Sequence, residues 1–143
     1  MAAKGIRLCN PANIRKGSNW KGLSAVQTDK SFCQFKSMAW GVRALIYLLR
    51  RYVQSYNLRS VRKIISRWAP PQDHNDTEAY IKFVVKNVSY CFDADQEFLS
   101  ARDFDIDYQE GCWKVFYLCK AMCKIETGYE LNYQTFLTAL SLL

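Results

Sequence analysis

One glutamate near the C-terminus has the surroundings that acid catalysis requires. Residues 112–126 (CWKVFYLCKAMCKIE) follow a helical pattern, and Glu126 continues the apolar stripe of Cys112, Phe116, Cys119 and Cys123. A carboxylate on an apolar face is costly unless it is paired or held protonated. A protonated carboxylic acid could donate its proton to a glycosidic oxygen. An arginine-paired glutamate that ends a helix is the alternative, and the periodicity leaves both open.

The other groups that could bind a metal do not have the spacing of a metal site. There is no Cys-x-x-Cys pair, and the only histidine, His74, lies far from most of the cysteines. Five aspartates between residues 93 and 107 fit no EF-hand spacing. We therefore expect no metal and no cofactor. We expect reduced, buried thiols at Cys9, Cys33, Cys91, Cys112, Cys119 and Cys123.

The central part of the chain has the pattern of three helices. Apolar residues at i, i+3 and i+4 predict a helix over residues 38–56. A second helix, capped by Ser60, must end near Trp68 because Pro70 and Pro71 follow. Asn75 is the expected cap of the third helix, with Glu78 reaching back to the Asn75 amide.

The rest of the chain predicts loops around a central helix. Turn signals over residues 5–37 indicate a loop with a small β-hairpin, and residues 91–111 indicate an acidic connector with a short helix near 96–101. Gly128 should end the helix that carries Glu126, and Asn132 should cap a last short helix. We therefore predict a mainly α (α+β) fold and a single domain over 1–143. Its parts are 5–37 (loop and hairpin), 38–90 (helical), 91–111 (connector) and 112–143 (central and C-terminal helices).

Composition narrows the choice of partner. The 143 residues include 20 Lys and Arg against 13 Asp and Glu, a formal charge of +7 that favours polyanions such as nucleic acid, anionic membrane or bacterial cell wall. The same charge is also ordinary for a soluble domain. No apolar run of about 18 residues predicts a membrane span, and the N-terminus lacks the apolar centre of a secretory signal.

Two motifs of the chain are quite specific, Asn10-Pro11-Ala12-Asn13-Ile14-Arg15 and Arg67-Trp68-Ala69-Pro70-Pro71. They resemble motifs of phage-encoded proteins that are often labelled virion structural proteins and look like lysozyme-like muralytic domains. The family's His-Glu-Asn-Gly motif corresponds here to Ile125-Glu126-Thr127-Gly128. Members of the family typically have Asn at the position of Cys9. The resemblance covers nearly the whole chain and implies a lysozyme-like helical domain.

The order of these motifs is similar to a circular permutation of goose-type lysozymes, lytic transglycosylases and glucosaminidases. In those enzymes a helix ending in Glu-Ser-Gly precedes an Asn-Pro-x-Asn-Ile segment, whereas here the Asn-Pro segment comes first. A permutation is physically reasonable because chain termini usually lie close together. The resemblance implies that Glu126 is the catalytic acid, and that Asn10, Asn13, Arg15 and Trp20 bind the sugar.

Two functions follow from the resemblance. The first is an endolysin-type muralytic enzyme, a glycoside hydrolase or lytic transglycosylase that cleaves the peptidoglycan backbone. The alternative is a non-catalytic virion structural or cell-wall-binding protein with the same fold. In both cases we expect glycan strands and other virion proteins as partners, and location in the virion or, before release, in the host cytoplasm. Specific nucleic-acid binding through Arg43, Arg50 and Arg51 is less favoured because no binding motif accompanies the charge.

Overall fold

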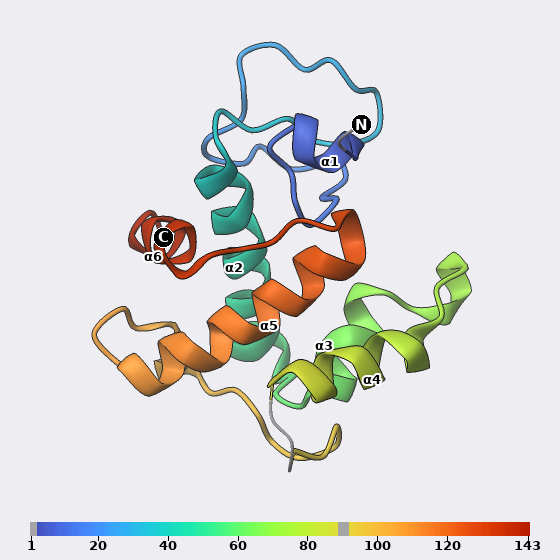
Figure 1. Ribbon diagram of the computed structural model, residues 1–143, viewed down its shortest axis with the longest axis vertical. Helices are drawn as coiled ribbons and strands as arrows, with labels where there is room; N and C mark the ends of the chain where they lie inside the picture. Colours follow the sequence, from blue (N-terminus) through green and yellow to red (C-terminus); the bar gives the residue numbers. More distant parts are fainter. Residues whose placement is uncertain (1–2, 89–91) are drawn as a thin grey trace. The chain divides into compact units, whose positions relative to one another are not determined.

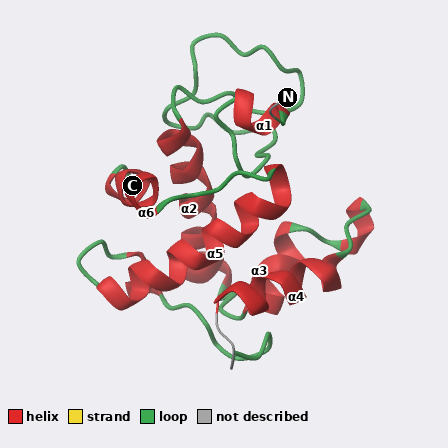
Figure 2. Cartoon of the chain, in the orientation of Figure 1, coloured by secondary structure: helices red, strands yellow, loops and turns green. Residues whose placement is uncertain are grey.

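The chain folds mainly into α-helices joined by loops. The computed structural model describes residues 3–88 and 92–143, and no named strand occurs among them (Figures 1 and 2). The helices are α1 (Lys4–Arg7), α2 (Met38–Tyr56), α3 (Val61–Trp68), α4 (Thr77–Val88), α5 (Gln109–Thr127) and α6 (Tyr133–Ser141). Two short 3₁₀ helices cover Pro71–Asp73 and Ala101–Phe104. The prediction of a mainly helical fold is confirmed.

The helices and loops form two compact units. The first comprises Met1–Leu48 and Met122–Leu143, and the second comprises Leu49–Ala121. In the first unit, residues from the two ends of the chain share one core. In the first unit that core contains Leu8, Ile14, Phe35, Leu45, Met122, Leu131 and Phe136.

The second unit is built around the α3–α4 pair. α3 buries Val61, Ile64 and Ile65 and packs against α4. Pro70 and Pro71 separate the two helices, as the sequence predicts. The Thr77 hydroxyl donates to the Ala69 carbonyl at 2.6 Å, which fastens the start of α4 to the end of α3.

The helix caps are partly as predicted. Ser60 Oγ accepts from the Lys63 amide at 3.2 Å, and Asn132 Oδ1 accepts from the Thr135 amide at 2.8 Å. The cap predicted for α4 is wrong, because Asp76 Oδ1 accepts from the Ala79 backbone amide, and the side-chain Nδ2 of Asn75 donates to the Pro70 carbonyl. Asn and Asp are almost equally good N-cap residues, so the sequence Asn75-Asp76 does not show which of the two caps the helix.

Three other expectations differ from the structure. Residues 5–37 form no hairpin strands but only isolated antiparallel bridges, Arg15 to Phe32 and Leu23 to Phe35. The short helix of the connector lies at Ala101–Phe104 and not at 96–101. Trp68, expected on the buried face of α3, is only half-buried.

Among the described residues, no helix is long and apolar enough to cross a membrane.

Candidate functional site

The Asn10–Arg15 loop is organised by the buried side chain of Asn10. Its Nδ2 donates to the carbonyls of Ile14 and Cys33, each at 2.9 Å, and its Oδ1 accepts from the Ile14 amide at 2.8 Å. Asn10 is 0% exposed, so every one of these groups would be costly to leave unpaired. The loop therefore holds its shape by internal hydrogen bonds.

This loop docks on the C-terminal end of α5, where Glu126 lies. Asn13 Nδ2 donates to the Glu126 carbonyl at 2.9 Å and lies 3.5 Å from Glu126 Oε1. The Thr127 hydroxyl donates to the Pro11 carbonyl at 2.8 Å. The last carbonyls of a helix have no hydrogen-bond donor within the helix. The Asn13 side chain supplies this donor to the Glu126 carbonyl. Residues separated by more than a hundred positions are thus brought together at one helix end.

Backbone geometry fixes how closely the loop approaches α5. Asn13 has a φ of +55°, in the left-handed region that asparagine tolerates better than most residues. At Gly5, a Cβ atom would lie 2.4 Å from Thr127 Cγ2 and 2.6 Å from the Asn10 carbonyl oxygen. Only glycine permits this approach of α1 to the loop and to the end of α5.

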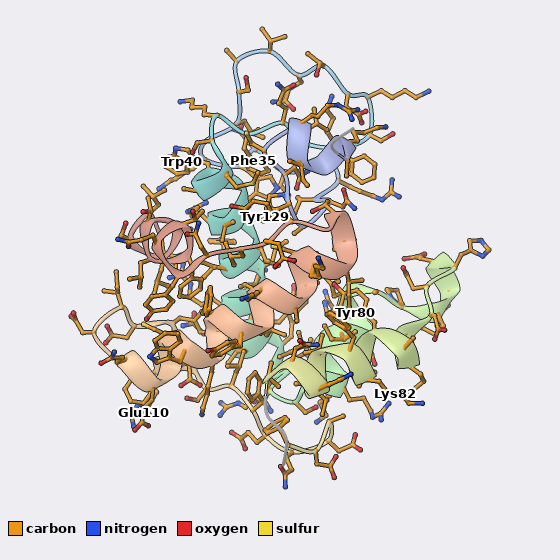
Figure 3. All side chains as sticks on the ribbon, in the orientation of Figure 1. Phe35, Trp40, Tyr80, Lys82, Glu110 and Tyr129 are labelled. Atoms are coloured by element: carbon orange, nitrogen blue, oxygen red, sulfur yellow. The ribbon has the colours of Figure 1, made fainter. Side chains whose placement is uncertain are left out.

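The carboxylate of Glu126 lies near a buried thiol. Cys123, one turn earlier on α5, is fully buried, and burial together with the Glu126 charge raises the pKa of its thiol to about 12. Tyr129 follows α5 and is half-buried (Figure 3), and burial raises the pKa of its hydroxyl. Glu126 is itself half-buried. The site thus combines one partly accessible carboxylate, one amide and groups that stay neutral.

The other residues predicted to bind sugar are placed differently. The Asn10 side chain is occupied inside its loop, so its assignment as a sugar ligand is corrected to a structural one. Arg15 is exposed, with its guanidinium 4.8 Å from the centre of the Phe32 ring. Trp20 packs edge-on against Tyr47 of α2, with 5.5 Å between ring centres. The structure therefore brings Asn13 to Glu126, while Trp20 packs on α2.

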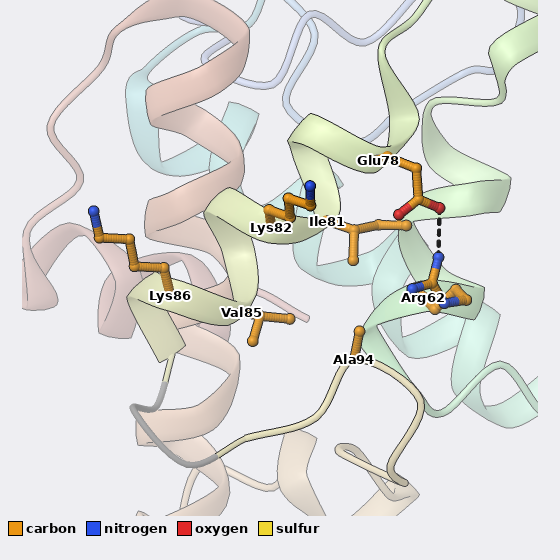
Figure 4. Close-up of a pocket in the computed structure, with 7 residues that line it drawn as sticks. All are labelled: Arg62, Glu78, Ile81, Lys82, Val85, Lys86 and Ala94. Carbon is orange, nitrogen blue, oxygen red and sulfur yellow. Dashed lines mark hydrogen bonds and ion pairs between the residues drawn. The ribbon is translucent and has the colours of Figure 1, made fainter.

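A groove that the sequence does not indicate lies in the second unit (Figure 4). Its volume is about 380 Å³, and it is lined by Arg62, Glu78, Ile81, Lys82, Val85, Lys86 and Ala94. Arg62 bonds to both Glu78, at 2.6 Å, and Asp95, at 2.7 Å, and these contacts raise its pKa. The arginine is thereby occupied in fastening the connector to α3 and α4.

Metal-binding side chains are dispersed in the described parts of the chain, where no group of three or more His, Cys, Asp or Glu could hold an ion. The thiols of Cys33, Cys112, Cys119 and Cys123 are buried, and that of Cys9 is half-buried. Cys91 lies outside the described residues. His74 is exposed at the end of the Pro71–Asp73 turn, with a φ of +63°.

Comparison with known proteins finds similarity to a phage protein. No protein-family model matches it. It is 45% identical over 87 residues to "Protein P5" of Pseudoalteromonas phage PM2, an alignment that covers 58% of this chain and 54% of the relative. The chain therefore spans about half the length of the curated relative it matches. It is similar to a phage-encoded protein along more than half of its sequence.

Proposed function

We propose that the chain is a phage virion protein that recognises the glycan strands of bacterial peptidoglycan, with Asn13 and Glu126 at the contact site. The observation that carries this proposal is the meeting of the Asn13 amide with the Glu126 carboxylate at the end of α5, with 3.5 Å between Nδ2 and Oε1. The similarity to a phage protein supports the virion setting. The lysozyme-like fold is part of the proposal and rests on the motif resemblance.

The chemistry of the two side chains suits an N-acetylated sugar. An asparagine amide both donates and accepts hydrogen bonds, and a carboxylate accepts from hydroxyl and amide groups. The Asn13 Nδ2 group donates to Glu126, and the Asn13 Oδ1 oxygen is the acceptor that the side chain offers to a sugar amide or hydroxyl. The net charge of +7 adds long-range attraction to the carboxylates of the wall peptides.

A second candidate is cleavage of the glycan with Glu126 as general acid. It is favoured by one observation, the position of this half-buried carboxylate next to the buried, neutral thiol of Cys123. An apolar wall on one side and access on the other is the setting in which a carboxylic acid can transfer a proton. Wall binding would be common to both candidates, so catalysis is tested separately.

Wall recognition is tested by co-sedimentation of the full chain with purified, insoluble peptidoglycan. Asn13→Gly removes the amide and tolerates the left-handed backbone, so we expect about tenfold weaker binding, the equivalent of roughly one good hydrogen bond. Asn87→Ala, on the exposed face of α4, is the matched control and should bind as wild type does. If wild type does not sediment with the wall, or if both variants bind equally well, the proposal is wrong.

Catalysis is tested by release of soluble muropeptides from the same wall. Glu126→Gln keeps the backbone carbonyl to which Asn13 donates, so the local fold should persist. If wild type releases muropeptides, the variant should be at least about 100-fold slower, the contribution of a general acid. Binding without any release by wild type would leave the non-catalytic virion protein as the function.

A further inference from the structure

The positively charged residues are unevenly distributed along the chain. Between residues 30 and 72 there are nine lysines and arginines and no aspartate or glutamate. In the second unit, Arg59 pairs with Glu97, and Arg62 pairs with Glu78 and Asp95. These pairs balance the charge of Arg59, which precedes α3, and of Arg62 on α3. The remaining cations are Arg43, Arg50 and Arg51 on α2, Lys63 and Arg67 on α3, and Lys30 and Lys36, which precede α2.

Two of these cations lie around the C-terminal end of α2, and a third lies on the same face of α3 as one of them. The Arg67 guanidinium of α3 lies 4.2 Å from the centre of the Tyr56 ring and 5.6 Å from that of Tyr52. The Arg51 guanidinium lies 5.9 Å from the centre of the same Tyr56 ring. Lys63 precedes Arg67 by four residues and therefore lies on the same face of α3. We call Arg51, Tyr56, Lys63 and Arg67 the arginine–tyrosine cluster.

The cluster is exposed and holds its guanidinium groups in place. All four side chains are exposed, Tyr56 by 43%. Arg51 donates a hydrogen bond to the Tyr56 hydroxyl, which lowers the pKa of that tyrosine. Stacking on the tyrosine rings restricts Arg67, and among the described residues no carboxylate lies within ion-pair distance of its guanidinium. A guanidinium fixed in this way loses little entropy when it binds an oxyanion.

We propose that the arginine–tyrosine cluster binds the phosphodiester backbone of nucleic acid without reading its sequence. Arginine forks match the geometry of phosphate oxygens, and backbone contacts carry no sequence information. The neighbouring exposed side chains are Gln54, Ser55, Asn57 and Ser66. These are polar groups that commonly bond to phosphate and sugar.

An anionic membrane is the competing polyanion, and the structure favours it less. Stable attachment to a membrane surface needs an apolar group that inserts in addition to the charge. Among the described large apolar side chains that are exposed, only Tyr56 belongs to this region, and two guanidinium groups lie over its ring. A phosphate backbone requires no such insertion.

The test is fluorescence anisotropy of the full chain with a labelled 20-base-pair duplex of mixed sequence over a series of salt concentrations. Arg51→Gln with Arg67→Gln should weaken binding about tenfold or more at low salt. It should also reduce the salt slope by about 2, as expected for two lost phosphate contacts. The matched control, Lys82→Gln with Lys86→Gln, removes the same charge from α4 and should change affinity less than about threefold. Arg67→Lys keeps the charge but loses the forked guanidinium, so its affinity for the duplex should lie between those of wild type and the arginine double variant. Thermal melting checks the fold of each variant.

Several results would overturn the proposal. The first is no binding of the duplex by wild type. The second is an equal loss in the two double variants, since the attraction would then be diffuse. The third comes from vesicles of phosphatidylglycerol and phosphatidylcholine. If vesicle binding depends on Arg51 and Arg67 while duplex binding does not, the cluster faces a membrane. None of these outcomes depends on peptidoglycan recognition at Asn13 and Glu126.

Discussion

At the scale of single residues, two asparagines of one loop have different roles. Asn10 is fully buried and bonds to backbone groups of its own loop and of Cys33, whereas Asn13 is half-buried and bonds to the end of α5. The sequence indicates both as polar groups in a binding loop. It does not show that Asn10 faces inward, because its partner Cys33 lies 23 residues away in a segment without secondary structure.

Asn10→Ala should therefore destabilise the fold. It would leave the carbonyls of Ile14 and Cys33 and the amide of Ile14 without their partner in a buried place. We expect the free energy of unfolding to fall by about 2–4 kcal/mol, a typical cost for such groups. Urea unfolding measures this. A loss below about 0.5 kcal/mol would show that water replaces the side chain and that the loop does not depend on it.

Asp29 makes the stability of the N-terminal loop sensitive to acid. The backbone amides of Phe32 and Ser31 donate to its carboxylate, and the Lys4 ammonium lies 3.1 Å away. These contacts lower the pKa of Asp29 to about 2. An aspartate in an unfolded chain titrates near 3.9. The ionised group therefore stabilises the fold above about pH 4, and this contribution is lost as the pH falls toward about 2.

We expect Asp29→Asn to be less stable than wild type at pH 7 and the difference to shrink as the pH falls from about 4 to 2. Urea unfolding of both proteins at pH 7, 4 and 2 provides the measurement. A difference that stays constant over this range would mean that the asparagine disturbs the loop by its shape and not by the lost charge.

At the scale of elements, periodicity predicted the helices well and the loops poorly. The predicted helix at 38–56 has the same bounds as α2, and the stop before Pro70 is correct. The helix that carries Glu126 begins earlier than predicted, at Gln109. The hairpin expected in 5–37 is absent from the described residues because only isolated bridges join its segments. Turn residues mark where a chain reverses, but not whether the flanking residues pair as a ladder.

The last helix should be indispensable despite its terminal position. Phe136 and Ala139 are 0% exposed and Leu140 is 4% exposed, so α6 buries its apolar face in the core. Truncation after Gly128 should yield an insoluble product or one without a cooperative melt, since termini are dispensable only when they bury little. Removal of Leu142 and Leu143 alone is the control and should leave the melt cooperative. A soluble truncate with a sharp transition would show that α6 does not support the core.

At the scale of the whole molecule, the charge of +7 is unevenly distributed along the sequence. Twelve of the 13 acidic residues follow residue 72, and the other is Asp29, while α2 and α3 carry only cations among their charged residues. Composition alone predicts a polyanionic partner, but not which surface meets it. The location of each surface required the structure, since the contacts of Arg67 with Tyr52 and Tyr56 join α3 to the end of α2.

The most direct test of glycan recognition at Asn13 and Glu126 is an NMR titration of the isotope-labelled full chain with a soluble peptidoglycan disaccharide. We predict saturable shifts of the Asn13 side-chain amide and of the backbone amides of residues 10–15 and 126–128, and their loss in Asn13→Gly. The backbone amides of α4 should not move. Saturable shifts confined to other surfaces, or no shifts at millimolar disaccharide, would contradict recognition at this site.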